Sequence, residues 1–169
     1  MNDVHPPVSP PLDPRALRKA LSGFATGVTV VTCRDGAGKA VGLTVNSFNA
    51  LSLDPPLVLW SLRLASPRLA AFDAAAHFAV NVLSEAQLGL SRRFASAQLA
   101  GLEPELWLDQ AGRAPLLAGS AAGFECALVS HQTAGDHRLY IGRVLAVTTQ
   151  PASPLLFHGG RYHRLGATL

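Results

Sequence analysis

The 169-residue sequence contains few charged side chains and few aromatic rings, which make up 15% and 7% of it. An average globular domain carries roughly 25% charged residues. A disordered polymer combines high charge with few apolar groups, so the 49% of apolar residues excludes that class. The low charge suggests that more surface is hidden than a lone domain would hide, and we therefore expect a partner subunit.

Basic runs and long apolar runs are also absent. The net charge is +3, but the 14 Lys and Arg residues are scattered, so neither a nucleic-acid partner nor a membrane partner is indicated. The excess of positive charge fits small anionic ligands better than a polyanion. No apolar stretch reaches the ~18 residues of a membrane span, and the first residues lack the pattern of a signal peptide. We expect a cytoplasmic protein.

The signatures of several catalytic classes are missing. Cys33 and Cys126 form neither a CxxC pair nor a zinc spacing, so we expect two buried thiols in a reducing compartment and no metal site. The sequence has no GxSxG elbow, Walker loop, GxGxxG turn or pair of carboxylates in an apolar context. Acyl transfer, P-loop chemistry, a Rossmann domain and glycoside hydrolysis are therefore not indicated.

The pattern that is present predicts a mainly β protein. Proline-rich residues 1–13 predict a disordered tail, and residues 14–169 form one domain. Helices are expected over 14–22, 69–75 and 84–94, and residues 95–119 read as irregular. Strands are expected over 28–33, 40–48, 57–62, 78–83, 124–131, 138–148, 155–157 and 162–165. Short turns join most neighbouring strands, which favours an antiparallel sheet closed into a barrel.

Polar side chains interrupt one apolar strand at Thr44–Ser47. Asn and Ser are poor strand formers, and donors and acceptors at a strand end can hydrogen-bond the polar edge of a planar ligand. The same residues also suit a purely local role, in which they satisfy turn backbone. His137, after the turn Gly135–Asp136, has two interpretations as well: it faces a cleft, or it is a structural or exposed side chain.

Arginine and serine gather in Ser91–Phe94 on one predicted helix, which Ser61 and the helix start Ser66–Arg68 could join. Helix N-termini and Arg side chains both bind phosphate. The alternative is a solvated helix face beside an ordinary N-cap.

Six segments together resemble the flavin reductase-like, FMN-binding split-barrel family, the reductase components of two-component flavin monooxygenases. Each segment alone is weak, but six in this order and at these spacings are specific, and the resemblance covers about residues 14–166. The segments are Thr26–Thr32, Gly42–Phe48, Leu51–Leu57, Phe78–Leu83, Leu90–Ala95 and Gly135–Val144.

The resemblance implies a six-stranded antiparallel Greek-key split barrel with a few peripheral helices, and a homodimer with the flavin near the subunit interface. It implies that His137 faces the nicotinamide as the catalytic residue. Many relatives carry Ser-x-Thr where this chain has Ser66–Arg68, a departure at the phosphate end. The residues implied to bind the flavin are Thr29, Thr44, Val45, Asn46, Ser47, Ala50, Ser52, Leu53, Ser61, Ser66, Asn81, Arg93 and Phe94.

The implied activity is that of an NAD(P)H:flavin oxidoreductase. Hydride passes from NADH or NADPH to FMN or FAD, and the reduced flavin is supplied to a separate flavin-dependent oxygenase. The two cofactors carry this reaction themselves, which agrees with the absence of a catalytic triad. Two alternatives remain: a flavin-binding split barrel without turnover, and a reductase of another acceptor such as a corrinoid.

Overall fold

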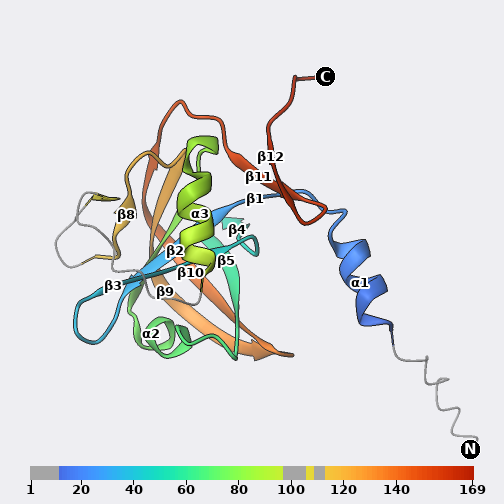
Figure 1. The fold of residues 1–169 in the computed structure, drawn as a ribbon. Helices are drawn as coiled ribbons and strands as arrows, with labels where there is room; N and C mark the ends of the chain where they lie inside the picture. Colours follow the sequence, from blue (N-terminus) through green and yellow to red (C-terminus); the bar gives the residue numbers. More distant parts are fainter. Residues whose placement is uncertain (1–11, 97–105, 109–112) are drawn as a thin grey trace, which may run out of the picture.

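The computed structural model describes residues 12–96, 106–108 and 113–169, and a seven-stranded antiparallel sheet forms its centre (Figure 1). The strands lie in the order β3-β2-β6-β9-β10-β5-β4. Their bounds are β2 (Thr29–Arg34), β3 (Ala40–Val45), β4 (Asn49–Leu53), β5 (Pro56–Arg63), β6 (His77–Val82), β9 (Ala122–Ala134) and β10 (His137–Thr149). The predicted mainly β, antiparallel fold is confirmed, although the sheet has one strand more than the six expected.

Strand β4 was not predicted from the sequence because none of its residues is buried. Four of its five residues are exposed, and Leu53 is 94% exposed. A strand of this kind at a sheet edge lacks the alternation of apolar and polar residues that identifies a half-buried strand. Only its pairing with β5 defines it.

Smaller elements surround the sheet. A three-stranded sheet is formed by β1 (Thr26–Gly27), β11 (Leu155–His158) and β12 (Arg161–Arg164). Strands β7 (Trp107–Leu108) and β8 (Leu116–Leu117) pair within the region predicted to be irregular. Residues 97–105 and 109–112 of that region lie outside the described residues, as do residues 1–11 of the predicted tail.

The described residues form three α-helices, α1 (Pro14–Leu21), α2 (Leu69–Ala74) and α3 (Leu88–Ala95), and a short 3-10 helix, η1 (Glu85–Gln87), directly before α3. These helices lie close to the predicted ranges. Asp13 caps α1 by accepting hydrogen bonds from two backbone N–H groups, and Pro14 follows at the first helical position. No residue of α1 is buried, and the helix stands away from the sheet in Figure 1. Within the described part of the chain, no helix is long and apolar enough to span a membrane.

Aromatic side chains fill the barrel interior. Trp60 of β5 stacks on Tyr140 of β10 with ring centroids 4.5 Å apart, and Phe72 of α2 meets Trp60 edge-on at 5.0 Å. All three rings are buried, and each buried apolar side chain stabilises the fold by roughly 1.5–3 kcal/mol. Helix α2 is thereby anchored at one end of the barrel.

Strand β2 is buried on both faces, so it joins this interior to a second apolar cluster. Val31 and Cys33 pack into the barrel, whereas Val30 packs with Phe94 of α3. Helix α3 is therefore held against the outside of the sheet. Both cysteines are buried as predicted, and burial raises the pKa of the Cys33 and Cys126 thiols to about 12, so they stay protonated at neutral pH.

Candidate functional site

A cavity of about 420 Å³ lies where the sheet closes into a barrel. Its size falls within the ~300–1,000 Å³ that is typical of small-molecule sites. The walls are the end of β3, the end of β5 with the following turn, the last turn of α3 and the first residue of β10. The lining residues are 43–47, 61–63 and 65–68, with Phe94, Ala95 and His137.

Ser47 connects the two edges of the sheet. Strands β3 and β4 are the edge strands, yet only residues 46–48 separate them in the chain, so the sheet must curl until its edges meet. The Ser47 hydroxyl donates to the Ser61 carbonyl oxygen at 2.9 Å and accepts from the Ser61 backbone N–H at 3.0 Å. One side chain thus satisfies backbone groups of β5 that a neighbouring strand would otherwise satisfy.

The other polar residues of the segment Thr44–Ser47 have different structural roles. The Thr44 hydroxyl donates to the carbonyl oxygen of Ser91 at 2.7 Å, which holds α3 against the end of β3. Asn46 is exposed at the cavity, and its amide has no hydrogen-bond partner among the described residues. Asn46 is therefore the side chain of this segment that is available to a ligand.

Phe94 gives the cavity an aromatic wall because β3 carries a glycine opposite it. A Cβ atom on Gly42 would lie 2.7 Å from Phe94 Cε1, closer than such atoms approach. Glycine at this position therefore lets the ring lie directly over the strand. Phe94 is only 4% exposed and also meets Trp107 edge-on at 6.2 Å.

His137 lines the cavity at the first position of β10 and is half-buried. Its Nδ1 lies 2.7 Å from Asp136 Oδ1. This hydrogen bond, together with the charges of His137 and Arg63, holds the pKa of the Asp136 carboxyl below its usual value. An ionised carboxylate only accepts hydrogen bonds, so Nδ1 carries the proton and Nε2 is the ring nitrogen left for a ligand.

Arg68 is a buried cation in the cavity wall. The residue is 8% exposed, its Nη2 donates to the Ser96 carbonyl oxygen at 2.8 Å, and its Nε has no partner among the described residues. Arg63 lines the cavity as well, whereas no described Asp or Glu does. The cavity is therefore positively charged.

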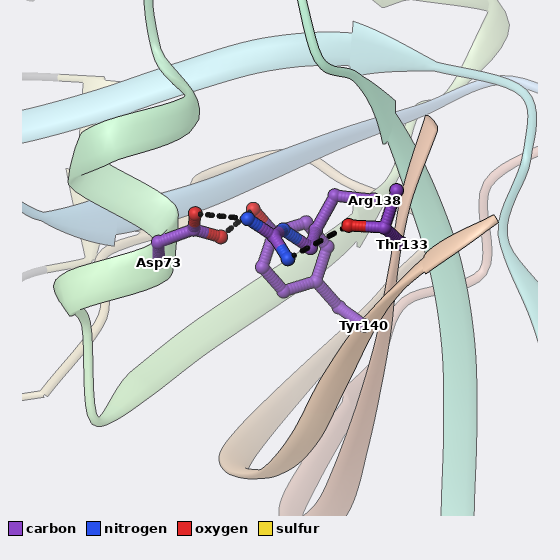
Figure 2. Close-up of polar contacts among 4 residues, drawn as sticks. All are labelled: Asp73, Thr133, Arg138 and Tyr140. Carbon is purple, nitrogen blue, oxygen red and sulfur yellow. Dashed lines mark hydrogen bonds and ion pairs between the residues drawn. The ribbon is translucent and has the colours of Figure 1, made fainter. Parts of the chain in front are cut away.

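A partly buried ionic network lies next to the cavity (Figure 2). Asp73 of α2 accepts hydrogen bonds from the Tyr140 hydroxyl at 2.6 Å and from Arg138 Nη2 at 3.1 Å, and Arg138 Nη1 donates to Thr133. Arg138 follows His137 on β10, while α2 follows the turn that lines the cavity. The network thus connects α2 to the β9–β10 hairpin that carries the histidine.

Eight of the predicted ligand residues line the cavity: Thr44, Val45, Asn46, Ser47, Ser61, Ser66, Phe94 and His137. The others do not: Thr29, Ala50, Ser52, Leu53, Asn81 and Arg93. Asn81 is buried, donates to the Val30 carbonyl oxygen at 3.0 Å and accepts from the Leu117 N–H at 2.8 Å. Thr29 is also buried and donates to the Val45 carbonyl oxygen. For the residues of both groups, contact with a ligand stays a prediction.

A family model described as "Flavin reductase like domain" matches residues 21–166, which is most of the chain. The chain belongs to the flavin reductase-like family. The predicted family membership is thereby confirmed.

Individual relatives agree with this membership. The chain is 44% identical over 150 residues to FMN reductase (NADH) SmoA of Agrobacterium fabrum (strain C58 / ATCC 33970), covering 89% of this chain and 85% of the relative. It is 40% identical over 155 residues to the flavin-dependent monooxygenase reductase subunit HsaB of Rhodococcus jostii (strain RHA1), covering 89% and 77%. It spans only 48% and 65% of two longer relatives from Rhizobium meliloti (strain 1021).

A solved structure agrees as well. The Streptomyces globisporus C-1027 NADH:FAD oxidoreductase SgcE6, in complex with NAD and FAD fragments, superposes with a TM-score of 0.83 at 35% identity. The match covers 94% of this chain and 98% of that one.

The cavity of this flavin reductase-like chain fits a flavin nucleotide. Such a ligand needs an apolar wall for its ring, hydrogen-bonding groups for its polar edge and a cation for its phosphate. Phe94, Asn46 and Arg68 supply these three features in one cavity. The buried Nε of Arg68, which has no partner among the described residues, is the observation that favours an anion there.

The family resemblance implied Arg93, rather than Arg68, for the phosphate. Arg93 is half-buried on α3 but does not line the cavity, whereas Arg68 does. The signal available in the sequence was the departure from the family's Ser-x-Thr pattern at Ser66–Arg68. A sequence cannot show that this arginine turns inward, because its burial depends on the packing of α2 and the end of α3.

We predict that two neighbouring substitutions affect different properties of the protein, one flavin affinity and the other stability. Asn46→Ala should weaken flavin binding several-fold to about tenfold, since a hydrogen bond contributes about 0.5–1.5 kcal/mol, and should leave the unfolding free energy unchanged. Ser47→Ala should lower the unfolding free energy by about 1–3 kcal/mol, because it leaves backbone groups of Ser61 unpaired. Flavin fluorescence titration and urea denaturation measure the two effects. If Asn46→Ala destabilises the protein and leaves flavin affinity unchanged, its role is structural.

Proposed function

We propose that this chain transfers hydride from a reduced nicotinamide dinucleotide to a flavin and supplies the reduced flavin to a separate monooxygenase. The predicted activity, an NAD(P)H-dependent flavin reductase, is confirmed by the family and by relatives named as FMN reductase and flavin reductase. The observation that carries the proposal for this site is the single cavity that joins an aromatic wall, a free amide and buried positive charge.

The chain's own residues bind and orient rather than react. When bound, the flavin accepts the hydride that the nicotinamide gives, so the two ligands supply the chemistry. Asn46 offers its amide to the polar edge of the flavin, and Phe94 supplies an apolar surface. Fixing two reactants in one geometry is itself a large part of catalysis in such reactions.

His137 is the residue we assign to the nicotinamide dinucleotide. Because Asp136 holds Nδ1, the ring orientation is set before any ligand arrives. With Nδ1 bound to Asp136, Nε2 is the ring nitrogen that we assign to the carboxamide group of nicotinamide. No proton transfer from the protein is required in this assignment.

A separate oxygenase is the proposed recipient of the reduced flavin. HsaB, the relative from Rhodococcus jostii, is by name the reductase subunit of a flavin-dependent monooxygenase. A cytoplasmic location stays a prediction from the sequence.

We also propose a homodimer. Apolar side chains are exposed on several elements, among them Leu21 of α1 at 65%, Phe24 at 74% and Val147 of β10 at 60%. Single exposed apolar residues are ordinary, but gathered apolar surface is typical of an interface. A second copy would cover α1, which buries no residue within one chain.

The activity is tested by NADH oxidation at 340 nm with and without added free FMN. We expect turnover that depends on added flavin, because a reductase of this kind passes its flavin on. Bound flavin with no NADH oxidation would instead identify a binding protein without turnover. NADPH and FAD in parallel assays measure the two cofactor preferences.

His137→Ala should raise the KM for the nicotinamide dinucleotide several-fold or more, lower kcat less, and leave flavin affinity nearly unchanged. Loss of binding that is equal in the ground and transition states raises KM alone. Asp136→Asn should act in the same direction but more weakly, because the ring remains while its orientation is less fixed. Unchanged steady-state parameters for His137→Ala would remove this residue from the site, and a collapse of flavin binding would place it in the flavin subsite.

The homodimer is tested by light scattering at micromolar concentration. We expect a measured mass twice that of the 17.7 kDa monomer. The interface should bury more than ~1,000 Å². Leu21→Glu on α1 should shift the equilibrium toward monomer. A monomeric wild type would refute the proposal.

A further inference from the structure

The part of the β9–β10 hairpin that carries His137 is held by few strand contacts. Strand β9 pairs with β6 only as far as Ala127, and beyond Leu128 it pairs with β10 alone. Figure 1 shows the tip of this hairpin, in orange, projecting at the lower end of the sheet. The hydrogen bond from His137 to Asp136 adds little support, because the Asp136 side chain is 80% exposed and water competes for it. Another contact is needed to fix the start of β10.

Strand β10 carries its cavity residue and its other polar residues on opposite faces. His137 pairs with Arg63 of β5, and both residues line the cavity. Successive side chains of a strand point to opposite faces, so Arg138 and Tyr140 share the other face. Tyr140 stacks there on Trp60 in the barrel interior, and neither Arg138 nor Tyr140 lines the cavity. A contact to these two side chains therefore fixes the strand and leaves the cavity open.

Asp73 of α2 makes that contact (Figure 2). Its Oδ1 accepts a hydrogen bond from the Tyr140 hydroxyl at 2.6 Å, and its Oδ2 accepts one from Arg138 Nη2 at 3.1 Å. Arg138 Nη1 donates at 3.0 Å to Thr133, which lies on the β9 side of the hairpin. One carboxylate thus connects α2 with both strands of the hairpin next to His137.

Helix α2 gives this carboxylate a fixed base. Phe72, the neighbour of Asp73, is buried and meets Trp60 edge-on at 5.0 Å. The side chains of Asp73 and Arg138 are 25% and 23% exposed, so water screens their attraction only in part. Partial exposure also lets either charge be solvated when its partner is replaced. Variants of this pair should therefore fold.

We propose that Asp73 is a positioning residue that fixes His137 in the cavity and thereby determines the affinity for the nicotinamide dinucleotide. It does so by holding Arg138 and Tyr140 on the other face of β10. The inference rests on the proposed function, which supplies the dinucleotide and the role of His137. Asp73 does not line the cavity, so it acts on the ligand only through the strand. A small displacement of a ligand-binding group has a large effect where two ligands must be aligned.

A second ion pair of the same fold provides a matched control. Arg113 Nη1 lies 2.9 Å from Oε2 of the buried Glu125, and neither residue lines the cavity. Glu125 lies opposite Ala146, toward the other end of β10 from His137. Arg113→Gln leaves a buried carboxylate unpaired and should lower stability. It should not move His137.

Steady-state NADH oxidation at saturating FMN is the first measurement. Asp73→Asn keeps an acceptor for the Tyr140 hydroxyl but loses the charge that binds Arg138. We expect it to raise the KM for NADH several-fold, by no more than His137→Ala does, with a smaller change in kcat and nearly unchanged flavin affinity. Arg138→Gln should act in the same way. Arg138→Lys should recover part of the loss, because it keeps the charge but not the fork.

A double-mutant cycle tests whether Asp73 acts through His137. In a His137→Ala background, Asp73→Asn should change the KM by less than about twofold, because the group that it positions is gone. Equal effects of Asp73→Asn in both backgrounds would mean that the two residues act independently, and would overturn the inference.

Amide hydrogen exchange of the flavin-free protein provides a readout that does not depend on activity. Asp73→Asn should speed exchange in residues 128–141 of the hairpin and leave exchange in β2 and β6 nearly unchanged. Arg113→Gln should lower the urea denaturation midpoint and leave both the hairpin exchange and the KM unchanged. A lower midpoint for Asp73→Asn with an unchanged KM would show a purely structural role and overturn the inference. So would a control variant that raises the KM as much as Asp73→Asn.

Failure of the proposed function gives a different result. A wild type that does not oxidise NADH with any flavin would contradict that function, and the inference with it. An active wild type whose His137→Ala variant keeps its KM would contradict the role of His137 and therefore also the inference. An active wild type in which His137→Ala raises the KM and Asp73→Asn does not would contradict only the inference about Asp73.

Discussion

The hydrogen bonds between the Ser47 hydroxyl and the backbone of Ser61 are the interaction on which the site depends. The two edge strands of the sheet are consecutive in the chain, so the sheet has to curl until its edges meet at residues 46–48. Where they meet, regular pairing gives way to side chain–backbone bonds, and a cavity opens beside them. Asn46 can face a ligand because Ser47, its neighbour, holds the closure.

Rigidity around the cavity comes from contacts outside it. Gly42 allows Phe94 to lie over β3, and the Thr44 hydroxyl fixes α3 at the same strand end. On the opposite side, Asp73 binds Arg138 and so connects α2 with the hairpin that carries His137 (Figure 2). Enclosure and the bond to Asp73 raise the pKa of Tyr140, which stays protonated and donates to that carboxylate. A reaction in which the ligands carry the chemistry depends on this fixed geometry more than on any reactive side chain.

The sequence predicted the site unevenly, and the reasons are physical. Thr44–Ser47 was recognisable because polar residues at the end of an apolar strand break its pattern. His137 was placed correctly at the start of a strand beside the cavity, because the Gly135–Asp136 turn marks that position. Asn81 was less well understood, since a buried amide that satisfies two backbone groups looks the same in a sequence as one that binds a ligand. Strand β4 was missed because it has no buried residue.

By itself, the sequence determined the family, the antiparallel β class, the three helices and the polar segment at the end of β3. Local propensity, helix caps and turns specify these features over a few residues, and six matching segments add up along the chain. Only the tertiary structure decided which hydroxyl closes the barrel, which arginine turns inward and which arginine finds a carboxylate. These choices depend on distances between residues far apart in the chain. The burial of these side chains cannot be seen in the local sequence pattern. It arises only when the sheet has curled and α2 and α3 have packed against it.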